Sequence, residues 1–79
     1  MKIKVRFFAA PREMLGAGEL VQELPAESTV QTLMDALIRT YPKLGSLPLK
    51  FAVNRAYASL DTQLCDGDEV ACIPPVGGG

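Results

Sequence analysis

Residues 28–41 read STVQTLMDALIRTY, and this stretch decides the fold class. Its apolar residues recur at intervals of three and four, the spacing that places them on one face of a helix. They are Val30, Leu33, Met34, Leu37, Ile38 and Tyr41. Ser28 and Gln31 fit a capping box at the start, and Pro42 ends the helix. The pattern therefore predicts one amphipathic helix whose apolar face packs on a core.

Short strands are expected on both sides of this helix. Residues 2–8 read KIKVRFF, in which apolar side chains alternate with bases as in a half-buried strand. We also predict a short helix over residues 11–16, strands over 19–24, 51–54, 57–60 and 70–73, a loop over 43–50 and a turn over 66–68. A right-handed crossover would set the last strand beside the first. The order predicts an α+β fold of the β-grasp type, a mixed sheet covered by one main helix.

Composition limits the function classes. The 79 residues allow one domain, and a net charge of −1 argues against nucleic-acid binding by counterion release. No apolar run approaches the roughly 20 residues that span a bilayer, and the N-terminus lacks the apolar core of a signal peptide. With no histidine and two cysteines, we expect no metal site and no disulfide framework. We expect a cytoplasmic protein without nucleic-acid or membrane partners.

Charged residues are grouped along the chain. Bases without acids occupy residues 1–12 and 39–55, whereas acids without bases occupy residues 13–35 and 61–69. We interpret these blocks as oppositely charged strands and turns that lie side by side. The alternative interpretation is a polarised surface that steers a partner.

Phe8 breaks the alternation of the first strand. It falls on the same face as Lys4 and Arg6, which predicts a large apolar side chain on the solvent side of the sheet. Either a connecting segment covers this side chain, or it belongs to a contact surface.

The chain ends with Pro74, Pro75, Val76, Gly77, Gly78 and Gly79. Glycines bury no side chain, so the segment is either a ragged end or a probe thin enough for a narrow channel. The prolines would hold the base of such a probe extended, and its reactive group would be the Gly79 carboxylate. We therefore divide the chain into a β-grasp domain, residues 1–76, and a flexible glycine tail, residues 77–79, that carries the reactive C-terminus.

Segments along the whole chain carry a family resemblance. They are residues 5–9 (VRFFA), 12–13 with Gly16, 29–30 with Leu33, 52–54, Leu64, 66–71 (DGDEVA), and 74–76 (PPV) with 78–79. Together they resemble the MoaD-like, sulfur-carrying small subunits of molybdopterin synthase, a branch of the ubiquitin-like β-grasp proteins.

This resemblance implies a chemistry at the C-terminus. An adenylyltransferase of the ubiquitin-activating type (MoeB-like) would join Gly79 to AMP derived from ATP, as a transient acyl adenylate. Sulfur would then replace one oxygen to give a thiocarboxylate. Gly78 and Gly79 would enter the active site of the large, catalytic (MoaE-like) synthase subunit, in a complex with two copies of each subunit. There a pterin precursor would receive the sulfur for the molybdopterin dithiolene. No stably bound cofactor and no metal are implied.

The resemblance also implies a partner-binding surface. Its residues are Phe8, Arg12, Tyr57 and Ile73, together with Pro74, Pro75, Val76 and Gly77 of the tail. Gly77 departs from the family, in which a bulkier residue such as threonine is common, and this predicts a looser tail.

Other functions stay open at the level of sequence. They are a ubiquitin-like modifier joined to lysines, a sulfur carrier for thiamine thiazole synthesis, and an interaction domain with an inert tail. Sulfur carried on a cysteine is a further alternative. Cys65 and Cys72 lack Cys-x-x-Cys spacing and a neighbouring positive charge, and the parity of Cys72 with Val70 predicts burial in the core.

Overall fold

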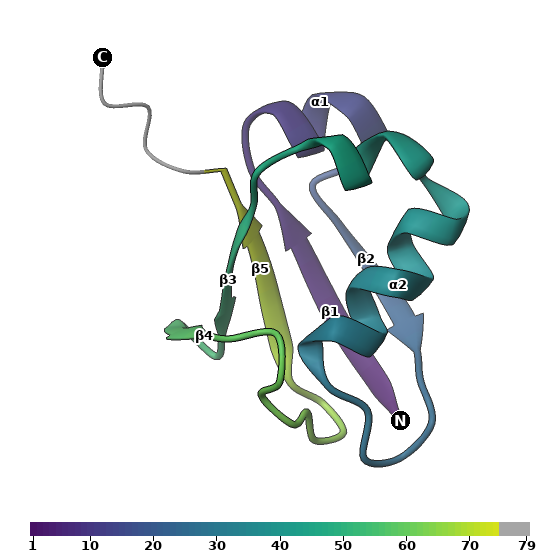
Figure 1. Ribbon diagram of the computed structural model, residues 1–79, viewed down its shortest axis with the longest axis vertical. Helices are drawn as coiled ribbons and strands as arrows, with labels where there is room; N and C mark the ends of the chain where they lie inside the picture. The colour runs from purple at the N-terminus through teal and green to yellow at the C-terminus, as the bar shows by residue number, and fades with distance from the viewer. Residues whose placement is uncertain (75–79) are drawn as a thin grey trace.

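The computed structural model describes residues 1–74 and contains a five-stranded sheet with one long helix across one face (Figure 1). The elements are β1 (Lys2–Phe7), α1 (Ala10–Leu15), β2 (Glu19–Glu23), α2 (Val30–Thr40), the 3-10 helix η1 (Pro42–Ser46), β3 (Lys50–Val53), β4 (Ala56–Ala58) and β5 (Glu69–Ile73). This arrangement confirms the predicted β-grasp fold. The predictions for Pro75, Val76, Gly77, Gly78 and Gly79, and the boundary between residues 1–76 and 77–79, lie outside the described residues.

The strand order is β2-β1-β5-β3-β4. β1 runs parallel to β5, whereas the other neighbouring pairs are antiparallel, so the last strand lies beside the first as predicted. Phe7 of β1 is in register with Cys72 of β5. Because these two strands are parallel, their C-terminal ends reach the same edge of the sheet.

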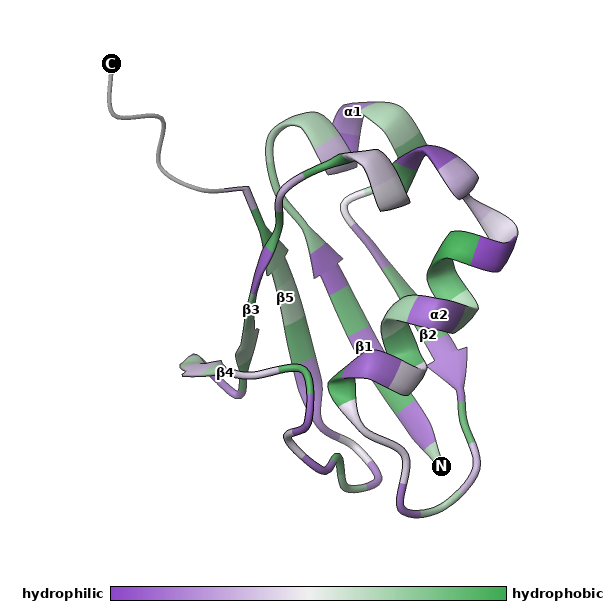
Figure 2. Ribbon diagram, viewed as in Figure 1, coloured by the Kyte–Doolittle hydropathy of each residue, from purple (hydrophilic) through white to green (hydrophobic). Residues whose placement is uncertain are grey.

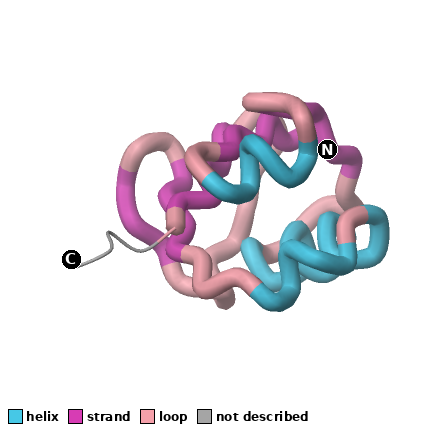
Figure 3. Tube along the Cα trace, turned by 90° about the horizontal axis from the view of Figure 1, so that it is seen from above, coloured by secondary structure: helices cyan, strands magenta, loops and turns pink. Residues whose placement is uncertain are grey.

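The core lies between α2 and the sheet, which form two layers (Figure 3). In Figure 2 apolar and polar residues alternate along β1, and the apolar set is Ile3, Val5 and Phe7, all buried. From α2, Val30, Leu33, Met34 and Leu37 are buried against them, which confirms most of the predicted stripe. Ile38 and Tyr41 pack at the margin of this core and are partly exposed. Over residues 1–74, no helix combines the length and apolarity needed to cross a bilayer.

The start of α2 differs from the sequence prediction. The N-cap is Thr29 rather than Ser28, and the capping box uses Thr32 rather than Gln31. The Thr32 backbone N–H donates to Thr29 Oγ1 (3.3 Å), and the Thr29 N–H donates to Thr32 Oγ1 (3.1 Å). Ser28 is buried, and its hydroxyl donates to the Pro25 carbonyl (2.7 Å). The helix cap therefore lies one residue later than predicted, because Ser28 is held by the preceding turn.

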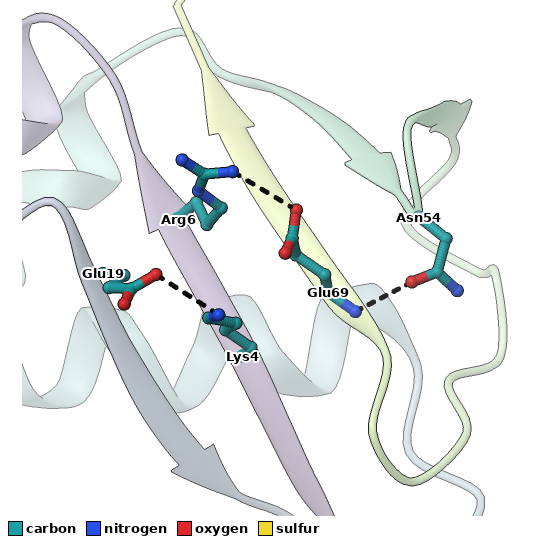
Figure 4. A network of polar contacts seen from close by, with 5 residues as sticks. All are labelled: Lys4, Arg6, Glu19, Asn54 and Glu69. Carbon is teal, nitrogen blue, oxygen red and sulfur yellow. Dashed lines mark hydrogen bonds and ion pairs between the residues drawn. The ribbon is translucent and has the colours of Figure 1, made fainter.

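Oppositely charged segments meet across the sheet, as the charge blocks predicted. Lys4 Nζ lies 3.6 Å from a Glu19 carboxylate oxygen, and an Arg6 guanidinium nitrogen lies 3.7 Å from Glu69 (Figure 4). All four side chains are solvent-accessible, so each pair contributes less than about 1 kcal/mol to stability.

Candidate functional site

A hollow of about 340 Å³ lies on the face of the sheet that α2 does not cover. We call it the open-face hollow. It is lined by Arg6, Phe8, Ala52, Arg55, Tyr57, Glu69, Ala71 and Ile73. Among these are three residues that the family resemblance assigned to a partner surface, namely Phe8, Tyr57 and Ile73.

The strand alternation explains why these residues share one face. Phe7 and Cys72 are buried on the helix side, so the next residue along each chain segment, Phe8 and Ile73, faces the other way. In the floor, Ala52 of β3 is in register with Ala71 of β5. Two small side chains side by side leave the depression that the larger rim residues surround.

Two aromatic side chains stand exposed at this hollow. Tyr57, on the edge strand β4, has 76% of its surface exposed, and Phe8, directly after β1, has 40% exposed. Exposed aromatic rings beside a shallow apolar floor are typical of the central contacts of protein interfaces. The geometry therefore fits the seating of a partner's apolar side chain.

Charged groups flank the apolar part of the hollow. The Arg6 guanidinium lies 5.6 Å from the centre of the Phe8 ring and 3.7 Å from the Glu69 carboxylate. Arg55 lines the hollow from the loop between β3 and β4. Sequence reasoning missed Arg55, because a residue in a turn has no strand parity that assigns it to a face.

Asn54 fixes the loop that carries Arg55. Its side-chain amide donates to an Asp68 carboxylate oxygen (2.9 Å), and the Glu69 backbone N–H donates to Asn54 Oδ1 (3.0 Å; Figure 4 shows the latter bond). Asn54 and Arg55 both have positive φ, 49° and 71°, as the tightest hairpin loops require. Asparagine tolerates this conformation better than most residues, and that preference was the available signal in the sequence.

The resemblance also placed Arg12 near the partner surface. It belongs to α1, and its guanidinium lies against Gly18, 3.5 Å from the position that a Cβ there would occupy. It is not among the residues that line the open-face hollow. Pro74, the last described residue, follows Ile73 at the end of β5 and is partly buried.

The two cysteines differ in environment. Cys72 is fully buried in the core, as predicted, and burial raises the pKa of its thiol to about 12. At neutral pH this thiol therefore stays protonated and is a poor nucleophile. Cys65 is exposed on the loop before β5.

Comparisons with known proteins show the family and the fold. Residues 5–79 match the model of the ThiS family. The chain is 40% identical over 83 residues to the molybdopterin synthase sulfur carrier subunit of Chlamydomonas reinhardtii, with 100% of both chains covered. It is 41% identical over 80 residues to the subunit of the same name from Escherichia coli, covering 98% of this chain and 99% of the relative. Among solved structures, SAMP1, the small archaeal modifier protein 1 of Haloferax volcanii, is 27% identical over 100% of both chains, with a TM-score of 0.89.

Proposed function

Because the chain belongs to the ThiS family and, within it, to the molybdopterin synthase sulfur carrier subunits, we propose that it carries sulfur on its C-terminal carboxylate for the synthesis of molybdopterin. One observation supports this proposal above the others. Phe8, Tyr57 and Ile73 line one hollow. It lies at the C-terminal end of β5, which Pro74 and the terminal glycines follow in the sequence. A partner that docks there is placed where the terminal segment begins.

Activation of the Gly79 carboxylate is the first step of this function. A carboxylate is a resonance-stabilised anion at neutral pH and does not react with sulfur nucleophiles. An adenylyltransferase of the ubiquitin-activating type would let a Gly79 carboxylate oxygen attack the α-phosphorus of ATP, with pyrophosphate as the leaving group. Sulfur at the oxidation level of sulfide would then attack the carbonyl carbon, and AMP would leave with its oxygen. The product is a C-terminal thiocarboxylate, and AMP is held only as a transient covalent intermediate.

Sulfur delivery is the second step, and it needs the large synthase subunit as partner. Six residues, 74–79, extend roughly 20 Å at most, which suits insertion into a deep active site. There the thiocarboxylate sulfur would attack a carbon of the pterin precursor, and a carbon–oxygen bond at that carbon would break as the oxygen group leaves. Water would then cleave the acyl–sulfur bond, which leaves sulfur on the pterin and returns the Gly79 carboxylate. The chain has no histidine, so acid–base groups would come from the large subunit.

Intact-mass spectrometry tests the proposal. The chain is produced together with its activating enzyme and a sulfur source, and a species heavier by the difference between sulfur and oxygen is expected. Fragmentation should place the added mass on the C-terminal glycine. The variant without residues 77–79, which ends in Val76, serves as control and should keep its unmodified mass. A wild-type chain that stays unmodified while the activating enzyme turns over ATP would refute the proposal.

A ubiquitin-like modifier is the second candidate function. The likeness to the small archaeal modifier protein 1 of Haloferax volcanii, with a TM-score of 0.89, favours it. A modifier would use the same acyl adenylate but would pass Gly79 to a lysine amine. Isopeptide-linked peptides that carry the terminal glycines, found by mass spectrometry of total protein, would support this candidate.

A further inference from the structure

The open-face hollow contains an imbalance of charge. Two guanidinium groups, from Arg6 and Arg55, and one carboxylate, from Glu69, line it. Its other lining residues are uncharged, so the hollow carries one net positive charge. The whole chain has a net charge of −1. The positive charge at the hollow is therefore a local property, opposite in sign to the net charge of the chain.

Arg6 is already engaged within the fold. Its guanidinium lies 3.7 Å from Glu69 and 5.6 Å from the centre of the Phe8 ring. These contacts use the only carboxylate of the hollow and keep Arg6 beside the aromatic ring. The excess positive charge therefore falls on Arg55.

Arg55 is exposed and has no acidic partner among residues 1–74. Its backbone position is nevertheless fixed. It sits in the two-residue loop that Asn54 ties to Asp68 and Glu69 by hydrogen bonds of 2.9 Å and 3.0 Å. The structure thus presents a cationic side chain from a rigid loop, next to the apolar rim that Tyr57 forms.

A partner that covers this rim must replace the water that hydrates the Arg55 guanidinium. An apolar surface laid over the guanidinium would remove its water without replacing the hydrogen bonds, which is unfavourable for a charged group. A carboxylate can accept two parallel hydrogen bonds from a guanidinium, and this geometry gives specificity as well as affinity. Complementary charge also speeds the encounter of two proteins.

We propose that the partner surface seated in the open-face hollow presents an acidic side chain to Arg55, beside an apolar side chain that packs among Phe8, Tyr57 and Ile73. The occupant is the large catalytic subunit of the synthase, so the inference rests on the proposed function. It adds to that function which chemical group of the partner recognises this chain. Charge complementarity at a fixed arginine carries it.

Binding of the full chain to the large subunit of the same organism tests the proposal by isothermal titration calorimetry at low and high salt. Arg55→Glu should weaken binding about tenfold or more, and it should reduce the loss of affinity on addition of salt. Arg55→Lys keeps the charge and should lose only a few-fold. Arg39→Glu makes the same charge change on α2, on the other face of the sheet, and should stay within about twofold of wild type.

A charge swap identifies the partner group. Lysine is substituted in turn for each exposed acid of the large subunit, and one such variant should restore binding to the Arg55→Glu chain. If Arg55→Glu does not fold, Arg55→Gln removes the charge and replaces Arg55→Glu in the calorimetric measurements at low and high salt.

The two levels of proposal fail differently. If the wild-type chain binds, Phe8→Ala weakens binding and Arg55→Glu does not, the acidic contact is absent and the sulfur-carrier function stands. If the wild-type chain does not bind the large subunit at all, the proposed function itself fails. If Arg55→Glu changes only self-association of the isolated chain in analytical ultracentrifugation, the occupant is a second copy, which also overturns the inference.

Discussion

Phe8 and Ile73 lie at neighbouring positions at the C-terminal ends of β1 and β5, because Phe7 and Cys72 are in register between these parallel strands. Both residues line the open-face hollow, and Ile73 is followed directly by Pro74 and the C-terminal segment. The open-face hollow and the start of the terminal segment are therefore fixed to each other by strand pairing. Loss of one rim residue should affect delivery of the terminus without unfolding the domain.

Phe8→Ala should weaken binding to the large subunit about tenfold or more, because truncation of a central aromatic side chain commonly costs more than 1 kcal/mol. The free energy of unfolding should change by less than about 1 kcal/mol, since 40% of Phe8 is exposed in the isolated chain. Calorimetric titration and urea denaturation measure the two quantities.

Val21→Ala is the matched control for Phe8→Ala. Val21 is an apolar residue of β2 with 64% of its surface exposed, and it does not line the hollow. It should bind like wild type. Equal losses in the two variants would show that the contact is not centred on the hollow.

Ala9→Gly should stabilise the fold. Ala9 has φ 55° and ψ −128°, a conformation that is strained for any residue with a Cβ. Glycine removes that strain but has more freedom in the unfolded chain, and we expect a net gain of about 1 kcal/mol, which raises Tm by about 4–8 °C. Ala10→Gly lies one residue further, at the start of α1, and should lower Tm or leave it unchanged. The same response in both variants would rule out strain at Ala9.

Asn54→Ala should lower the free energy of unfolding by about 1–3 kcal/mol. It removes the bonds to Asp68 and Glu69 and places a less tolerant residue at φ 49°. Asn54→Gly keeps the backbone preference and loses only the bonds, so it should be less destabilising. Urea denaturation of the three chains separates the two contributions, and equal stability of wild type and Asn54→Ala would contradict this role.

Alkaline pH should destabilise the protein partly through Cys72. Burial raises the pKa of this thiol from its ordinary value of 9.0 to about 12 in the folded state. A raised folded pKa means that the contribution is fully present below about pH 9 and is lost as pH rises towards 12. Cys72→Ala should therefore lose less stability than wild type between about pH 8 and pH 11, with a difference of about 2 kcal/mol.

Cys65→Ala is the matched control, because it removes the exposed thiol and leaves the buried Cys72 in place. It should follow wild type at each pH in urea denaturation. At neutral pH, iodoacetamide should label Cys65 and leave Cys72 unmodified. Rapid alkylation of Cys72 in the folded chain would show that the thiol is not protected as described.

Much of the fold was predictable because its signals are local. The spacing of three and four residues along α2, and the alternation along β1, report burial directly. Crossover handedness then placed β5 beside β1, and parity placed Phe8 and Cys72 on opposite faces. These features follow from period and chirality, which a sequence displays.

The features that were missed depend on competition between nearby groups. Ser28 and Thr29 are both good N-caps. The Ser28 hydroxyl donates to the Pro25 carbonyl instead, so Thr29 caps the helix. The predicted loop after α2 contains η1, a short 3-10 helix whose pattern is too brief to detect. Arg55 was missed, because the direction of a loop sets where the side chain of a turn residue lies.

The central claim is that sulfur is carried by the chain terminus and by no side chain. A single-turnover assay tests it most directly, with the Cys65→Ser/Cys72→Ala chain prepared as a C-terminal thiocarboxylate and mixed with the large subunit and the pterin precursor. We predict that this chain forms molybdopterin as wild type does, whereas the same chain with an unmodified Gly79 carboxylate forms none. Failure of the cysteine-free thiocarboxylate, or sulfur transfer by the chain with an unmodified Gly79 carboxylate, would contradict the claim.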